Sequence, residues 1–176
     1  MLIREATPID APGIARVHID SWRTTYKGLM PEHIIASRSY EYRERLWTRI
    51  LTEQQAQTFV YVAEEDGEIV GFVSGGANRD NDSIYKGELQ AIYILKAYQG
   101  KGLGQRLASA LVVRLMEQGY TSMLLWVLTG NHQARRFYEA LGGKKVAERQ
   151  EEMGDAMLDE LAYGWDNITP LARLDV

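Results

Sequence analysis

The chain of 176 residues contains no cysteine. Without a thiol it has no disulfide, no thiolate nucleophile and no metal site with cysteine ligands. Its histidines, His18, His33 and His132, are scattered and share no metal-type spacing. We therefore expect these histidines to be ordinary surface or core residues, and we expect no metal site.

A strong excess of charge of either sign is also missing. The 20 lysines and arginines face 24 acidic residues, which gives a formal net charge of −4. Binding to nucleic acid or to an anionic membrane surface draws on a basic excess, so we expect neither partner. The slight acidic excess favours a cationic small substrate only weakly, because most charges belong to the solvated surface.

Long apolar runs and targeting segments are absent as well. No apolar run reaches about 18 residues, the length that a membrane-spanning helix requires. The opening residues, MLIREATPIDAPG, lack the basic and then apolar regions of a secretory signal. No low-complexity tract or Pro/Gly/Ser-rich linker divides the chain. The sequence therefore predicts one cytoplasmic domain over residues 1–176, with a sizeable core.

The hydrophobic pattern of the chain predicts a mixed α/β fold in the order β-α-α-β-β-β-α-β-α-β-β. Segments with helical spacing alternate with strand-like runs. The helical segments follow residue 10, cover 39–55, follow residue 102 and cover 131–141. We expect strands over 2–7, in two runs within 58–80, and over 87–95, 121–130, 144–150 and 156–165. The strands on either side of the helix that follows residue 102 should be parallel and joined by a right-handed crossover.

Three glycines lie close together at the start of that helix, at positions 100, 102 and 104. A strand that leads through a glycine-rich turn into a helix presents unpaired backbone N–H groups, and the helix dipole adds positive charge there. A phosphate is the natural ligand of such a turn. The alternative interpretation is a loop that merely packs tightly.

The spacing of the glycines separates three kinds of phosphate site. A P-loop requires G-x-x-x-x-G-K-[ST], which does not occur. A dinucleotide fold requires G-x-G-x-x-G and a later acidic residue, whereas this chain has G-x-G-x-G and no acidic residue ends the following strand. The string QGKGLG, residues 99–104, instead resembles the Q/R-x-x-G-x-G/A signature of the GCN5-related N-acetyltransferases, the GNAT family, which binds acetyl-CoA.

The resemblance extends beyond the loop. It covers ELQAIYILKAYQGKGLGQRLASALV and LLWVLTGNHQARRFYEALGGKKV, and the order of elements agrees from residue 58 to residue 165. It implies a GNAT fold: a mixed, mostly antiparallel sheet whose central parallel strand pair is splayed around acetyl-CoA, with helices on both faces. Residues 1–57 would then form the acceptor side and 58–165 the cofactor-binding core. The segment SWRTTYKGLMP also resembles a part of small-amine and polyamine acetyltransferases.

The family resemblance implies an enzyme that moves the acetyl group of acetyl-CoA to a primary amine by direct attack in a ternary complex, without a metal. The backbone of the strand end would pair with the pantetheine arm, and the glycine loop would hold the pyrophosphate with help from two basic side chains. The cofactor-binding residues would be Ile92, Tyr93, Ile94, Gln99, Gly100, Lys101, Gly102, Leu103, Gly104, Gln105, Arg106, Asn131 and Tyr138.

Two residues are predicted to act in catalysis through the same resemblance. Tyr138 corresponds to the tyrosine that faces the sulfur and would be the general acid; its alternative is a core aromatic on an apolar helix face. Glu88 would be the base, and its alternative is a solvated carboxylate at a strand end. Strict alternation puts Glu88 on the face of Gln90, Ile92 and Ile94, a register that a strand bulge would alter.

The acceptor side is predicted from the first helices, which cover the acceptor in relatives. Its candidates are Asp20, Trp22, Tyr26 and Glu32, each with a surface or core role as the alternative. The partner would be a small-molecule or peptide amine, and a homodimer is common in such enzymes. Two other functions stay open: a non-catalytic acyl-CoA-binding domain of the same fold, and an acyltransferase with a different acyl donor.

Overall fold

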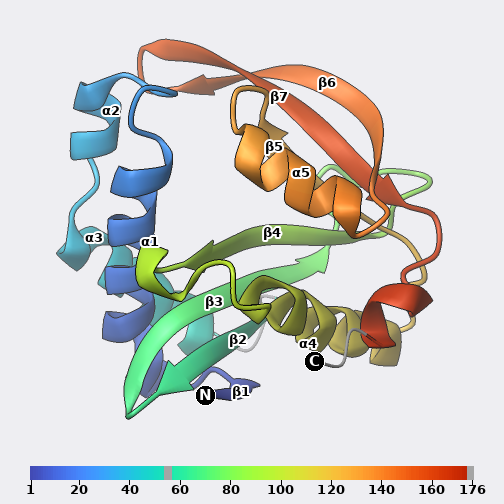
Figure 1. Ribbon diagram of the computed structural model, residues 1–176, viewed down its shortest axis with the longest axis horizontal. Coiled ribbons are helices and arrows are strands. Elements are labelled where there is room, and N and C mark those ends of the chain that lie inside the picture. The colour runs from blue at the N-terminus through green and yellow to red at the C-terminus, as the bar shows by residue number, and fades with distance from the viewer. Residues whose placement is uncertain (54–56, 174–176) are drawn as a thin grey trace.

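The structure, a computed structural model, describes residues 1–53 and 57–173, and within them seven strands form one mixed sheet. Its strand order is β1-β2-β3-β4-β5-β7-β6, and every neighbouring pair is antiparallel except β4 and β5 (Figure 1). The strands are β1 (Leu2–Glu5), β2 (Thr58–Glu65), β3 (Glu68–Ala77), β4 (Gly87–Ile94), β5 (Met123–Leu128), β6 (Lys144–Met153) and β7 (Ala156–Trp165). The predicted fold class is thereby confirmed.

The helices follow the predicted order with one addition. They are α1 (Ala11–Thr25), α2 (Glu32–Ala36), α3 (Tyr40–Thr52), α4 (Leu103–Glu117) and α5 (His132–Ala140), with 3₁₀ turns η1 (Pro8–Asp10), η2 (Lys96–Tyr98) and η3 (Thr169–Arg173). The addition is α2, which begins directly after Pro31. Positions 54 and 55 of the helix expected over 39–55 lie outside the described residues. No helix in the described ranges is both long and apolar enough to cross a membrane.

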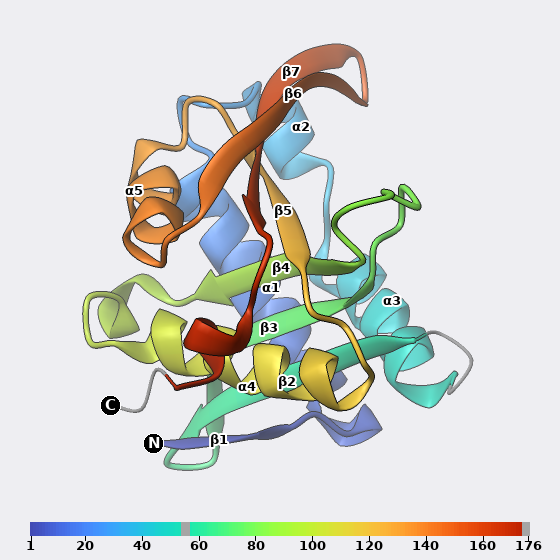
Figure 2. The ribbon, with the colours of Figure 1, turned by 90° about the vertical axis from the view of Figure 1, so that its right-hand side faces the viewer.

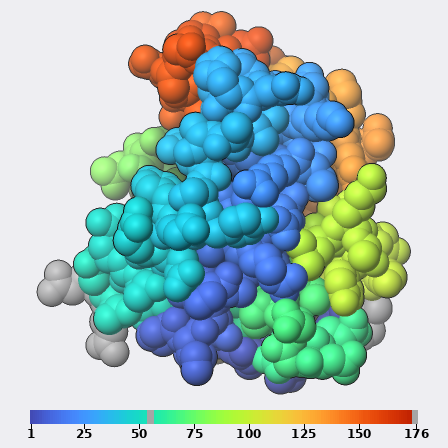
Figure 3. Space-filling view, turned by 90° about the vertical axis from the view of Figure 1, so that its left-hand side faces the viewer, coloured from blue at the N-terminus to red at the C-terminus, as the bar shows by residue number. Residues whose placement is uncertain are grey.

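The two faces of the β1–β4 part of the sheet carry different helices. On one face α1 and α3 pack their apolar side chains against Phe72 of β3, and on the other α4 covers the sheet. Leu107, Leu111 and Leu115 of α4 are fully buried there, and each contributes about 1.5–3 kcal/mol to folding. Figure 2 shows the sheet with α4 in front of it and α1 behind it, and Figure 3 shows α1, α2 and α3 together on one surface of the molecule.

Short turns confirm the local signals in the sequence. Asp66 and Gly67 both have positive φ, 51° and 81°, as the tight turn between β2 and β3 requires. Gly119 ends α4 with φ 87°, and Gly142 ends α5 with φ 85°. Asn131 caps α5, because its side-chain oxygen accepts a hydrogen bond from the backbone N–H of Ala134.

The parallel pair in the middle of the sheet is short. β4 and β5 are in register only at Gly87 with Met123 and at Glu88 with Leu124. Beyond these pairs the two strands separate, and the antiparallel hairpin of β6 and β7 continues the sheet on the far side of β5 (Figure 1). The divergence opens the sheet at the carboxyl ends of β4 and β5.

A β-bulge in β4 changes which residues share a face. Ser74 of β3 pairs with Ala91 and the next residue, Gly75, pairs with Leu89, so Gln90 is the extra residue. The face predicted by strict alternation is therefore wrong for Glu88. Leu89, Ile92 and Ile94 belong to the α4 face, whereas Glu88 is in register with Gly76 on the side of Ala91 and Tyr93.

Candidate active site

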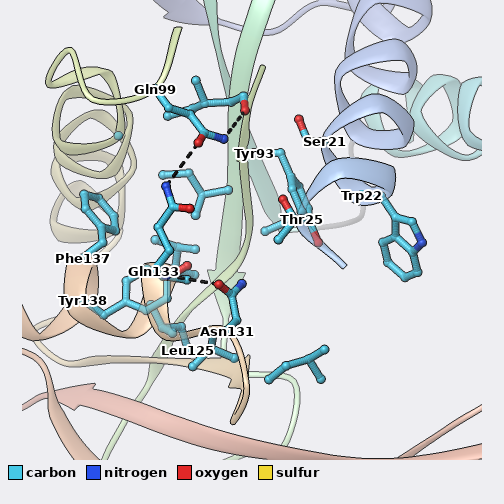
Figure 4. A pocket seen from close by; sticks show the side chains of 18 of the residues that line it. Ser21, Trp22, Thr25, Tyr93, Gln99, Leu125, Asn131, Gln133, Phe137 and Tyr138 are labelled. Atoms are coloured by element: carbon cyan, nitrogen blue, oxygen red, sulfur yellow. Dashed lines mark hydrogen bonds between the residues drawn. The ribbon is translucent and has the colours of Figure 1, made fainter. Parts of the chain in front are cut away.

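The gap between the diverging strands is a cavity of about 540 Å³. Ser21 and Thr25 of α1 and Tyr93 of β4 lie on one side of it, and Phe137 and Tyr138 of α5 lie on the other (Figure 4). The cavity runs from the glycine loop, at the start of α4, to residues of α1, β5 and the β6–β7 hairpin. One continuous space thus joins the predicted donor site to the predicted acceptor side.

The glycine loop closes the donor end of the cavity. Gly100 and Gly102 have φ values of 72° and 77°, a region that side chains disfavour. Gly102 is the N-cap of α4 and has no side chain to satisfy the helix amides. No described residue accepts a hydrogen bond from the backbone N–H of Leu103, Gly104 or Gln105. These amides and the helix dipole make this turn an anion cradle.

Gly104 serves a different purpose from the other two glycines. A Cβ built on it would lie 3.0 Å from Cζ of Phe137, so its absence lets α5 approach α4. The phosphate interpretation therefore fits Gly100 and Gly102, and the packing interpretation fits Gly104. Of the two predicted basic residues, neither Lys101 nor Arg106 lines the cavity; Nζ of Lys101 lies 5.4 Å from the ring centre of Tyr98.

Two glutamines link the end of β4 to α5 beside the cavity. Nε2 of Gln99 donates to the carbonyl oxygen of Ile94 at 3.0 Å, and Nε2 of Gln133 donates to Oε1 of Gln99 at 3.2 Å (Figure 4). The strand end, the loop and the helix are thereby fixed relative to one another. Ile92 and Ile94 line the cavity between them.

Tyr138 projects into the cavity from α5 (Figure 4). It is 8% exposed, and burial raises the pKa of its hydroxyl, with a smaller contribution from Tyr93. Within the part of the chain that the structure describes, this hydroxyl forms no hydrogen bond. It is therefore a protonated donor at neutral pH, with no protein acceptor to occupy it.

On the acceptor side the structure brings together two of the predicted residues. Trp22 and Tyr26 line the cavity, and the hydroxyls of Tyr26 and Tyr93 are hydrogen-bonded at 2.9 Å. Burial raises the pKa of both tyrosines. Asp20 lies outside the cavity lining and accepts a hydrogen bond from Tyr40 at 2.5 Å, and Glu32 is exposed on α2.

Glu88 is buried but does not line the cavity. Both of its oxygens are occupied by Arg79: Oε1 accepts from Nη2 at 2.6 Å, and Oε2 accepts from the backbone N–H at 3.0 Å. Its role as a base stays a prediction.

Sequence reasoning missed the acceptor-side residues that come from the far end of the chain. Trp126 of β5, Met153 of β6 and Glu160 of β7 all line the cavity. Their strands are recognisable in the sequence. Their position beside Tyr26 depends on the pairing of β7 with β5, which no local pattern specifies.

Known proteins resemble this chain in sequence. Residues 21–143 match the model of the acetyltransferase (GNAT) family. The N-acetyltransferase YuaI of Bacillus subtilis strain 168, itself uncharacterised, is 35% identical over 173 residues, which cover 98% of this chain and 96% of YuaI. The L-methionine sulfoximine/L-methionine sulfone acetyltransferase of Salmonella typhimurium strain LT2 is 32% identical over 89 residues, about half of each chain.

A solved structure shares the fold. It is that of yncA from Salmonella typhimurium with its cofactor acetyl-CoA, and it matches with a TM-score of 0.69 and 24% identity over 94% of this chain and 92% of yncA. The fold, the glycine loop and the sequence of α5 are all consistent with the family match. The chain therefore belongs to the GNAT acetyltransferase family and is an N-acetyltransferase.

Proposed function

We propose that this enzyme transfers the acetyl group of acetyl-CoA to the primary amine of a small, amino-acid-like molecule in a ternary complex. The observation that carries the proposal is the single cavity that joins the amide cradle of α4 to Tyr138 and to the aromatic acceptor side. Donor and acceptor can therefore meet without leaving the protein, and well-oriented reactants can contribute roughly 7–11 kcal/mol to lowering the barrier.

The donor end fits coenzyme A. The amides of Leu103, Gly104 and Gln105, which no described residue accepts, suit the pyrophosphate, and Gly102, whose positive φ favours glycine, places no side chain beside them. Ile92 and Ile94 line the next part of the cavity and present a strand edge to an amide-containing arm. When bound, acetyl-CoA supplies an activated acetyl group as a thioester.

Tyr138 is proposed as the general acid. After the acceptor ammonium has lost a proton to solvent, the neutral amine nitrogen forms the new N–C bond as the C–S bond breaks, and the Tyr138 hydroxyl gives its proton to the departing sulfur. The nitrogen then loses its surplus proton to solvent, from which Tyr138 is reprotonated. Because burial raises the pKa of this hydroxyl, it stays protonated through neutral and moderately alkaline pH. Because it donates to no residue in the described ranges, it is available to the sulfur.

The choice of a small amino-acid-like acceptor rests on relatives and on the acceptor side. One relative is named for L-methionine sulfoximine and L-methionine sulfone, and another is the L-amino acid N-acyltransferase MnaT of Escherichia coli. The acceptor end here is lined by Trp22, Met30 and Met153, which suit a thioether-like or aliphatic body. A polyamine or a peptide amine is the competing class.

The test is a two-stage measurement on the full chain. Acetyl-CoA should raise the Tm of thermal unfolding. An unchanged Tm at millimolar acetyl-CoA would contradict the proposal. CoA release is then followed with L-methionine sulfone, L-leucine, spermidine and a short peptide. Binding without release from any of them would favour a non-catalytic acyl-CoA domain, and a series of longer acyl donors would expose a different donor preference.

A further inference from the structure

Among the cavity-lining residues that the structure describes, Glu160 carries the only acidic side chain. It comes from β7, where its register partner is Leu128 at the end of β5. Leu128 also lines the cavity, so Glu160 lies beyond the point at which β4 and β5 separate. Glu160 therefore borders the space that the acceptor must enter.

The two oxygens of Glu160 have different surroundings. Oε2 accepts a hydrogen bond from Nε of Arg149 at 2.8 Å. Oε1 has no hydrogen-bond partner in residues 1–53 or 57–173. The side chain is 13% exposed, so the carboxylate is largely shielded from bulk water. Glu88 differs, because Arg79 contacts both of its oxygens.

Arg149 orients Glu160 without cancelling its charge. The same guanidinium lies 3.2 Å from Oδ2 of Asp80 and 3.5 Å from Oε2 of Glu151, so one cation is shared by three carboxylates. It is held over the ring of Trp126, 4.0 Å from the ring centre, which fixes its position. The cluster therefore keeps an excess of negative charge beside the cavity.

The neighbours of Glu160 in the cavity are suited to a cation with an apolar body. Burial raises the pKa of the Tyr26 hydroxyl, with smaller contributions from Tyr93, Tyr138 and Glu160. Met30, Trp126 and Met153 supply apolar and aromatic surface around them. A primary ammonium has three N–H donors, which one free carboxylate oxygen and two tyrosine hydroxyls can accept.

From this arrangement we infer that Oε1 of Glu160 binds the primary ammonium of the acceptor, with Arg149 as a positioning residue that holds the carboxylate. The inference rests on the proposed N-acetyl transfer and names the contact that selects the acceptor. The acceptor class is a primary ammonium attached to a compact apolar body. A charge-assisted contact of this kind is about twice as strong as a neutral hydrogen bond.

The experiment compares Glu160→Gln with Asp159→Asn. Asp159 is the adjacent residue on the same strand, is exposed, and points to the other face, where it accepts a hydrogen bond from Gln150. Both substitutions remove one negative charge. Glu160→Gln should raise the KM for the amine at least tenfold and leave the KM for acetyl-CoA within twofold, whereas Asp159→Asn should leave both within twofold.

Glu160→Asp keeps the carboxylate and serves as a second variant in case Glu160→Gln fails to fold. It should fall between the wild type and Glu160→Gln in the KM for the amine. Equal amine KM values for Glu160→Gln and the wild type would overturn the role of Glu160 while the transferase activity stands. CoA release from no amine of the panel by the wild type would instead contradict the proposed function.

Discussion

The donor and acceptor ends of the cavity are built in opposite ways. The donor end consists of the end of β4, the loop after it and the first turn of α4, which are adjacent in sequence, and it offers backbone groups. The acceptor end gathers Tyr26, Trp126, Met153 and Glu160, which lie far apart in sequence, and it offers side chains. A ligand common to a whole family can be held by the backbone, whereas a ligand that differs between members must be selected by side chains.

The largest expected effect comes from Tyr138, which lies where the two ends meet. Tyr138→Phe should lower kcat by about 10²–10⁴-fold, the usual contribution of a general acid, while the Kd for acetyl-CoA stays within twofold. Steady-state kinetics and ligand titration measure the two quantities. The control is Tyr163→Phe, because the hydroxyl of Tyr163 is buried outside the cavity and donates to Glu139 at 2.5 Å. Equal loss of kcat in both variants would contradict the assignment.

The next effect should be confined to the donor end. Gly102→Ala places a Cβ at the amide cradle on a backbone with φ 77°, so the Kd for acetyl-CoA should rise at least tenfold. Gly119→Ala is matched, because it lies at the other end of the same helix with φ 87° and away from the cavity. Both should lose about 1 kcal/mol of stability, but only the first should weaken ligand binding in a calorimetric titration.

A third prediction concerns the tyrosine pair on the acceptor side. Tyr26→Phe leaves the hydroxyl of Tyr93, which is half-buried at the cavity wall, without its partner, so the free energy of unfolding should fall by about 0.5–1.5 kcal/mol. The KM for the amine should rise several-fold and the KM for acetyl-CoA should not change. In the double variant Tyr26→Phe/Tyr93→Phe most of the stability should return, because neither polar group is then stranded. Urea unfolding measures the free energy of unfolding of each variant. If the loss in the double variant equalled the sum of the losses in the two single variants, the two hydroxyls would not be coupled.

The smallest effect on turnover is expected for Glu88→Gln. Because Glu88 is bound to Arg79 away from the cavity, the variant should lose about 1–3 kcal/mol of stability and keep kcat within threefold. A base at this position would behave differently: kcat/KM would fall mainly at low pH, where more of the amine is protonated. A pH profile of kcat/KM therefore separates a base from a buried structural ion pair.

The sequence predicted the helices, strands and turns around the donor end well because the features that form them are local. The strand, the glycine turn, the helix and the Asn131 cap each depend on neighbours within a few residues, and each appears in the structure where it was expected. The fold class followed from the same local patterns combined with the family resemblance. The position of Gly104 against Phe137, by contrast, became visible only from the packing of two helices.

The acceptor end could not be predicted to the same depth. Trp22 and Tyr26 were expected there and line the cavity, but Asp20 and Glu32 do not. Helical spacing gives the face of a side chain but not the distance to a strand that is more than a hundred residues away. Glu160 and its partner Arg149 come from the β6–β7 hairpin, and their place beside the cavity follows from long-range strand pairing.

The bulge at Gln90 has a consequence for the length of β4. If the strand kept this residue but ran without the bulge, regular alternation would turn Glu88 toward the α4 face, where Ile92 and Ile94 meet the apolar side chains of Leu107 and Leu111. A carboxylate there would be cut off from Arg79 and buried among hydrocarbon, at a cost of several kcal/mol. Deleting Gln90 would instead remove the bulge and leave Glu88 on its present face, so a redesigned strand should either keep this residue together with the bulge or lose both.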